Sequence, residues 1–222
     1  MSASHCLRQD YRTWVFDCDG VIMDSNRVKT DAYFQIALPY GKEVAEALVA
    51  YHMLQGGVSR YEKFAYMLTE LLGQPLLDHK VNDLARIFGE YMYNNLLACP
   101  LTEGLKELRC ATEGSRWMVV SGGDQDELRR LLVERGIASL FDGGIFGSPA
   151  DKDEILAREH LSGNLDFPAL FIGDSRYDHE AAQCAGIDFV FASAWTEFSE
   201  WQDYAAIWQF PVVSSVKYLT PN

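Results

Sequence analysis

Apolar and polar positions divide the chain into stretches of different character. A short apolar run, Thr13-Trp-Val-Phe16, is rich in strand-forming residues and stops abruptly at Asp17-Cys-Asp-Gly20. A bounded apolar run of this length is typical of a strand buried inside a parallel sheet. We therefore expect the first strand to end at Asp17.

A helical pattern runs through residues 25–98, where apolar side chains recur at every third or fourth position. Short turns rich in glycine and proline separate the helical stretches. No strand pattern occurs among these residues. The pattern predicts an all-helical insertion, with helices over 26–38, 42–55, 59–72 and 81–97.

From residue 100 onward the pattern alternates between strand and helix. Strands are predicted over 117–120, 144–146, 169–172 and 188–191, and helices over 102–111, 124–135, 151–161, 177–185 and 195–204. Such alternation predicts a parallel sheet with right-handed crossovers. The expected fold class is α/β, an open parallel sheet with helices on both faces plus an inserted all-helical domain.

The same pattern suggests how the 222 residues are divided. A chain of this length suits a core with a smaller inserted domain. The core is expected over 12–24 and 99–205, and the helical insertion over 25–98. Residues 1–11 are expected to form a poorly ordered leader, and the tail over 206–222 has no assigned role.

Charge and cysteine content narrow the possible partners. The formal net charge is −13, which argues against binding to nucleic acids or to anionic membranes. No apolar run is long enough to span a membrane, and the first residues lack the apolar region of a signal peptide. The five scattered cysteines fit reduced thiols. We therefore expect a cytoplasmic protein.

Candidate chemistry gathers where the predicted strands end. The first strand ends in Asp17-Cys-Asp19, the second in Ser121-Gly-Gly-Asp124, and a later one in Gly173-Asp-Ser-Arg-Tyr-Asp178. Lys152 lies between the last two in sequence. Ligands of open parallel sheets bind outside the carboxyl ends of the strands, so these segments are expected to meet there.

Several carboxylates converging at one edge need a cation among them. Asp17, Asp19 and Asp174 offer hard oxygen ligands, which favour Mg²⁺ over Zn²⁺. A carboxylate beside such an ion can attack phosphorus, and a second carboxylate can transfer the proton. The Ser121 hydroxyl and nearby backbone N–H groups can donate hydrogen bonds to phosphoryl oxygens, and the Lys152 ammonium can offset their charge.

Four short motifs carry a family resemblance. Phe16-Asp-Cys-Asp-Gly-Val21 resembles the first motif of the haloacid dehalogenase superfamily, and Val119-Val-Ser-Gly122 resembles its second. Lys152 stands where the lysine of the third motif is expected, and Gly173-Asp-Ser-Arg-Tyr-Asp178 is similar to the fourth. All four occur in the family's order, so the resemblance covers about residues 12–192.

The resemblance implies a role for each motif residue. Asp17 would be the nucleophile and Asp19 the general acid and base, while Ser121, Gly122 and Lys152 would bind the phosphoryl group. Mg²⁺ would be held by Asp17, by the backbone carbonyl of Asp19 and by Asp174, with Asp178 in support. An acid at position 19 implies phosphate-ester chemistry. The resemblance also implies that the sheet is a Rossmann-like core and that the helical insertion is a mobile cap.

Within that cap, Gly57-Val-Ser-Arg60 resembles the specificity loop of the β-phosphoglucomutase-like branch, whose arginine contacts the substrate. Lys29 and Gly56 stand where a β-phosphoglucomutase has a histidine and a lysine, which argues against mutase activity. We therefore expect a phosphatase acting on a small phosphorylated metabolite, a sugar or hydroxy-acid phosphate. A phosphomutase is the alternative, and the family permits a monomer or a homodimer.

Simpler interpretations accompany these assignments. Lys29 is expected at the surface, and the five histidines are expected to be structural or solvated because they show no ligand spacing. A phospho-acceptor signalling module would combine a similar acidic pocket with a lysine on an open sheet. Such modules are much shorter, and a helical block of about 70 residues after the first strand has no place in them.

Overall fold

The central layer of the computed structural model is a parallel sheet of six strands. The structure describes residues 11–219, so the expected leader over 1–11 lies outside it except for Tyr11. The spatial order is β3-β2-β1-β4-β5-β6, and every neighbouring pair is parallel. The strands are β1 Thr13–Phe16, β2 Arg116–Asp124, β3 Gly144–Ser148, β4 Ala169–Gly173, β5 Asp188–Ala192 and β6 Val212–Val213. The expected α/β class is confirmed.

Strand β1 lies in the middle of the sheet and is buried along its whole length. Phe16, its last residue, pairs with Val119 of β2 on one side and with Ile172 of β4 on the other. Because the three strands are in register here, the residues that follow them emerge at one common edge. The fold thus brings together segments that are more than 150 residues apart in sequence.

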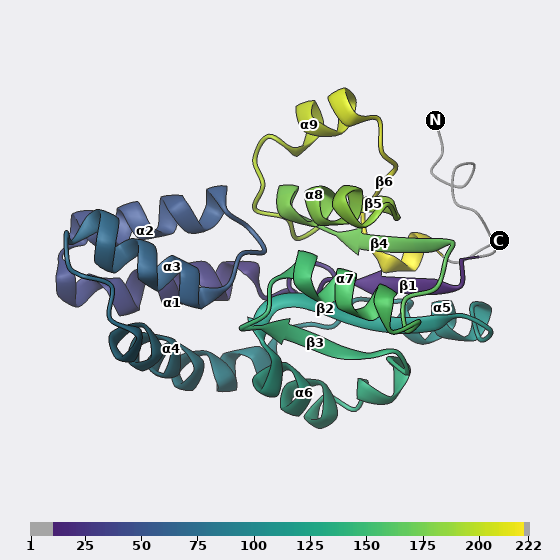
Figure 1. Ribbon diagram of the computed structural model, residues 1–222, viewed down its shortest axis with the longest axis horizontal. Coiled ribbons are helices and arrows are strands. Elements are labelled where there is room, and N and C mark those ends of the chain that lie inside the picture. Colours follow the sequence, from purple (N-terminus) through teal and green to yellow (C-terminus); the bar gives the residue numbers. More distant parts are fainter. Residues whose placement is uncertain (1–10, 220–222) are drawn as a thin grey trace.

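Helices cover both faces of the sheet (Figure 1). Trp14 and Phe16 point to one face and pack with the apolar residues of α5 and α6, whereas Val15 points to the other and packs with those of α7 and α8. Each large apolar side chain buried in this way contributes roughly 1.5–3 kcal/mol. The core helices are α5 Leu105–Ala111, α6 Gln125–Glu134, α7 Lys152–Leu161, α8 Arg176–Ala185 and α9 Trp201–Trp208, with a short 3-10 turn η4 at Ala138–Leu140.

The segment between β1 and α5 contains helices only, as the pattern predicted, and Figure 1 shows α1 to α4 beside the sheet. It has its own apolar core, in which Tyr33 packs against Phe64 and Phe88. We call residues 26–98 the helical segment. Its elements are α1 Asn26–Ala37, η2 Leu38–Tyr40, α2 Lys42–Leu54, α3 Arg60–Tyr66, the π-helical turn η3 Met67–Leu71 and α4 Asp78–Ala98.

The carboxyl-terminal region differs from the expectation. The helix expected over 195–204 instead spans Trp201–Trp208, and the tail supplies the edge strand β6 and a final 3-10 turn, η5 Val216–Leu219. Val213 and Val216 are buried in the main core, so this part of the tail belongs to the sheet domain. A strand of two residues is too short to produce a recognisable alternation, which is why the pattern missed it.

Tyr11 is a second correction, because it was expected in the leader. Its ring packs edge-on against Trp14, and its hydroxyl donates to Asp188 at 2.8 Å. Across residues 11–219, every helix is too short or too polar to serve as a membrane span.

Candidate active site

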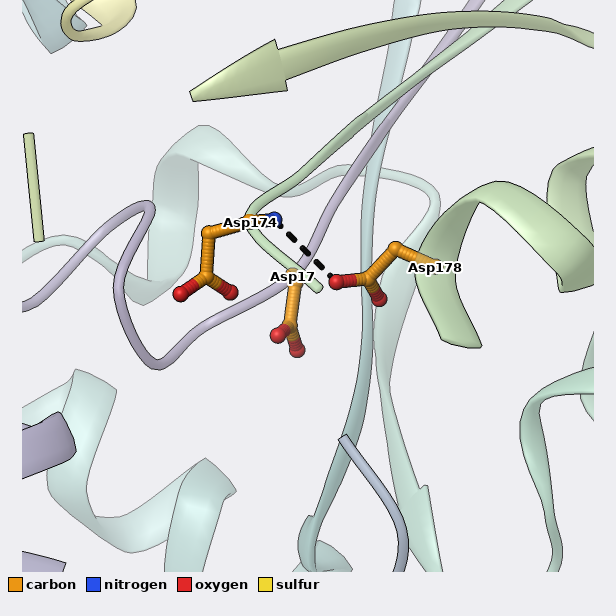
Figure 2. Close-up of side chains that lie close together, drawn as sticks. All are labelled: Asp17, Asp174 and Asp178. Atoms are coloured by element: carbon orange, nitrogen blue, oxygen red, sulfur yellow. Dashed lines mark hydrogen bonds between the residues drawn. The ribbon is translucent and has the colours of Figure 1, made fainter. Parts of the chain in front are cut away.

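Three buried carboxylates meet at the carboxyl edge of the sheet (Figure 2). Asp17 directly follows β1, Asp174 directly follows β4, and Asp178 lies in the first turn of α8. One oxygen from each lies within 4.8 Å of the others. At most 5% of any of these residues is exposed to solvent. The structure therefore brings together three of the acids expected at the site.

Asp178 is held in place by the start of α8. Its Oδ2 accepts hydrogen bonds from the backbone N–H groups of Asp174 (3.1 Å) and Ser175 (3.0 Å) and from the Ser175 hydroxyl (2.7 Å). The Ser175 side chain in turn accepts from the Asp178 N–H, which completes a capping box. These bonds fix the Asp178 carboxylate within the cluster, and its Oδ1 accepts a hydrogen bond from Lys152.

Lys152 is the single cation paired with these acids among the residues that the structure describes. It opens α7, which is capped by Asp151, and its Nζ lies 3.1 Å from Oδ1 of Asp17 while also bonding to Asp178. Burial alone would lower the pKa of Lys152, but the charges of Asp17 and Asp178 outweigh it and raise that pKa. The lysine therefore stays charged beside Asp17.

The negative charge of the cluster exceeds what Lys152 can neutralise. Burial raises the pKa of Asp17 to about 7 in spite of Lys152, and the nearby Asp178 charge adds to the rise. The pKa of Asp174 is raised even more clearly, by burial and then by the charges of Asp178 and Asp17. Oδ1 of Asp17 is also buried without a well-directed hydrogen bond from any described residue. This set of oxygens fits a hard divalent cation.

A deep cleft opens beside the cluster, enclosing about 760 Å³ of unfilled space including its mouth. Asp17, Asp174 and Gly122 line its floor at the sheet edge, and residues of the helical segment, Arg60 among them, line the opposite side. The loop before α3 comes very close to the sheet: a Cβ added at Gly122 would lie 2.1 Å from the carbonyl oxygen of Gly57.

These features can be compared with known proteins. The family model of haloacid dehalogenase-like hydrolases matches residues 11–186. The chain belongs to this family.

Relatives of this haloacid dehalogenase-like hydrolase agree with the assignment. A phosphorylated carbohydrates phosphatase of Thermotoga maritima is 26% identical over 187 residues, which cover 80% of this chain and 82% of the relative. A crystal structure described as a predicted phosphatase from Clostridium acetobutylicum superposes with a TM-score of 0.72 at 18% identity, covering 95% and 96% of the two chains. CbbY from Rhodobacter sphaeroides, solved with phosphate, gives 0.69 at 18% identity and the same coverages.

The second aspartate of the first motif is bonded to residues outside the three-carboxylate cluster of this hydrolase. The Asp19 carboxylate accepts from the Ser25 hydroxyl at 2.5 Å and is paired with Lys29. Burial would raise the pKa of Asp19, but the charge and hydrogen bond of Lys29 outweigh it and lower that pKa. Asp19 is therefore held in its ionised form, which is the form that can accept a proton.

Lys29 was expected at the surface, and this expectation is wrong: its side chain is only 17% exposed and it lines the cleft. The reason is the position of α1, which begins at Asn26 and so places its first turn over the end of β1. Asn26 was missed altogether. Its amide donates to Oδ2 of Asp174 at 2.7 Å and thereby orients that carboxylate. An asparagine at a helix start gives no distinctive sequence signal.

Two further residues named from the motifs occupy defined positions. Ser121 is 1% exposed near the end of β2, where its hydroxyl accepts from the Gly123 N–H at 3.1 Å. Arg60 lines the cleft but is engaged within the protein, since it donates to the Ala85 carbonyl at 3.0 Å and pairs with Glu127 of α6. Substrate contact by Arg60 stays a prediction.

Proposed function

We propose that this chain is a Mg²⁺-dependent phosphatase that hydrolyses a phosphorylated carbohydrate through an aspartyl phosphate on Asp17. The observation that carries the proposal is the position of the Asp17 carboxylate, between a charged lysine on one side and Asp174 on the other. The relative from Thermotoga maritima bears the name of a phosphorylated carbohydrates phosphatase, which supports this substrate class.

We propose that Mg²⁺ is held by Asp17, Asp174 and the backbone carbonyl of Asp19, with Asp178 in support. The excess negative charge of these buried carboxylates is what favours a divalent cation here. When bound, such an ion neutralises charge on the phosphoryl group and on the carboxylates around it. It would also keep Asp17 ionised, which a nucleophile requires.

Residues of the chain carry out the attack on phosphorus, the binding of the phosphoryl group and the proton transfers. An oxygen of Asp17 attacks phosphorus, and Lys152, held beside that carboxylate, offsets the charge that develops on the transferring group. The Ser121 hydroxyl and the N–H groups after β2 bind the phosphoryl oxygens. Asp19 in its protonated form gives its proton to the leaving oxygen, and the carboxylate formed in this way then removes a proton from the attacking water. Because Lys29 favours the ionised form of Asp19, the structure suits the second of these steps.

We propose that the helical segment acts as a cap that closes over this chemistry. The carbonyl of Gly57 lies against Gly122, Arg60 is paired with Glu127, and the Tyr61 hydroxyl donates to Asp124 at 3.0 Å. These contacts join the segment to the sheet domain directly above the cluster. Closure of this kind excludes bulk water while one positioned water completes hydrolysis.

A phosphomutase is not favoured. Lys29 stands where that branch has a histidine and is engaged with Asp19, and the named relative is a phosphatase. We propose that the protein acts in the cytoplasm, in keeping with free cysteines at positions 18, 99, 110 and 184. We further propose that it acts as a monomer or a homodimer.

Steady-state turnover of p-nitrophenyl phosphate with and without Mg²⁺ tests the proposal. Asp17→Asn should abolish turnover and remove the phosphoryl adduct that mass spectrometry detects after an acid quench. Asp31→Asn, which alters an exposed carboxylate on α1, is the matched control and should behave as wild type. Near-normal activity of Asp17→Asn would show that the nucleophile is misassigned.

A further inference from the structure

A second group of buried donors lies on the cap side of the same cleft. Lys63 of α3 and His52 of α2 both line it, and they are only 2% and 7% exposed. The Lys63 ammonium lies 2.8 Å from Nδ1 of His52 and 5.4 Å from the centre of the Tyr33 ring. None of these three residues belongs to the four motifs.

Lys63 differs from the other cations of the cleft because it lacks a counter-ion. Lys29 is paired with Asp19 and Arg60 with Glu127, but within residues 11–219 no carboxylate lies within 4 Å of the Lys63 ammonium. Burial lowers the pKa of Lys63 to about 7, and the charge of Lys29 adds to the effect. An ammonium buried in this way is unfavourable unless an anion joins it.

His52 supplies a second donor without an acceptor. When Lys63 is protonated it can only donate, so in that state Nδ1 of His52 accepts from Lys63 and the imidazole proton lies on Nε2. That Nε2–H group is buried and has no hydrogen-bond partner in the described part of the chain. Lys63 therefore presents an ammonium without a carboxylate partner among the described residues, and His52 presents an unsatisfied N–H donor, on one wall of the cleft.

We propose that Lys63 and His52 bind a second anionic group of the substrate, a phosphate or a carboxylate at the end of the carbohydrate remote from the transferred phosphoryl group. The proposal rests on the phosphatase function proposed above. An anionic oxygen would accept from both donors and provide the missing counter-charge, which a sugar hydroxyl would not. The preferred substrate is then a phosphorylated carbohydrate with two anionic ends.

Three phosphorylated six-carbon compounds test this preference. Glucose 6-phosphate carries one anionic group, 6-phosphogluconate adds a carboxylate, and glucose 1,6-bisphosphate adds a second phosphate. Wild type should have a higher kcat/KM for at least one of the two-anion compounds, and which of them it prefers identifies the anion. Lys63→Met should lower that kcat/KM roughly 10- to 100-fold more than the value for glucose 6-phosphate, mainly through KM, as expected for a lost charged hydrogen bond.

Two other variants complete the experiment. Lys42→Met removes an exposed lysine of α2 and should keep the wild-type preference. His52→Phe keeps a ring against Tyr33 but removes both nitrogens, so it should lose the preference in the same direction as Lys63→Met and serves if that variant fails to fold. Equal loss for all three substrates in both variants, or no two-anion preference in wild type, overturns the proposal. Turnover of p-nitrophenyl phosphate reports separately on the phosphatase function.

Discussion

The contact between the helical segment and the sheet domain can be tested by adding one methyl group. Gly122 lies near the end of β2, and its backbone is outside the left-handed region, so alanine is compatible with its conformation. A Cβ at this position would nevertheless lie 2.1 Å from the Gly57 carbonyl oxygen and 2.9 Å from the Gly57 carbonyl carbon. Both atoms are backbone, so no side chain can rotate away to make room.

The size of the effect follows from this geometry. Ordinary van der Waals contact begins at 3.4 Å, so the loop at Gly57 has to retreat by about 1.3 Å in Gly122→Ala. Arg60 and Tyr61 follow this loop in the chain, so their bonds to α6 and to Asp124 are strained as well. A displacement of about 1 Å near reacting groups can lower the rate about 100-fold. We expect a fall of that order in kcat/KM with the sheet domain intact.

Turnover of p-nitrophenyl phosphate, together with urea unfolding, measures both consequences. Gly114→Ala is the matched control, because a Cβ there meets no atom within 4 Å, and its kcat/KM should equal that of wild type. The free energy of unfolding of Gly122→Ala should fall by no more than about 1 kcal/mol. If Gly122→Ala keeps kcat/KM within roughly threefold of wild type, closure of this loop is not needed for catalysis.

Three further predictions concern proton transfer, metal binding and pH. Asp19→Asn should slow phosphoenzyme breakdown by roughly 100- to 10,000-fold, so quenched mass spectrometry should detect an accumulated adduct, and its absence contradicts the role of Asp19 as base. Mg²⁺ at 100 times its dissociation constant should stabilise wild type by about 2.7 kcal/mol in thermal unfolding, and an equal gain in Asp174→Asn would exclude Asp174 as a ligand. Burial lowers the pKa of Lys63 from 10.5 in the unfolded chain to about 7 in the folded chain, so between these pH values the unfolded chain binds more protons than the folded one. The contribution of Lys63 to the free energy of unfolding therefore rises with pH across that window. Lys63→Met should therefore be more stable than wild type at pH 7, by at most about 4 kcal/mol, and lose this advantage by pH 10 in urea unfolding; a difference that does not change with pH contradicts the reasoning.

The strands and their acidic ends could be predicted because both signals are local. An apolar run that stops at Asp17, and another that stops at Gly173-Asp174, mark the carboxyl ends of buried parallel strands wherever they occur. Parallel strands share one polarity, so their ends meet at one edge without any further information. The capping residue Asp151, one position before Lys152, has a similarly local origin.

Other features depend on how elements approach one another in space. The strand β6 has only two residues and exists because it pairs with β5. From the sequence, Lys29 cannot be distinguished from a lysine on the surface of a helix. In the structure, its ammonium pairs with the carboxylate of Asp19, which follows β1. The Lys63–His52 pair joins two helices of the helical segment, and neither residue belongs to a recognisable sequence motif.

The sequence alone therefore determined the class of fold, the edge of the sheet at which the candidate site lies and the acids expected there, since periodicity and strand ends are properties of short segments. Only the tertiary structure decided which charges are neutralised. Asp19 has a partner in Lys29, Asp17 has an oxygen without a hydrogen bond, and Lys63 has no counter-ion in the described chain. Whether a charge is neutralised depends on how deeply its group is buried and on its distance from charges on other elements. No local pattern of residues encodes burial or these distances.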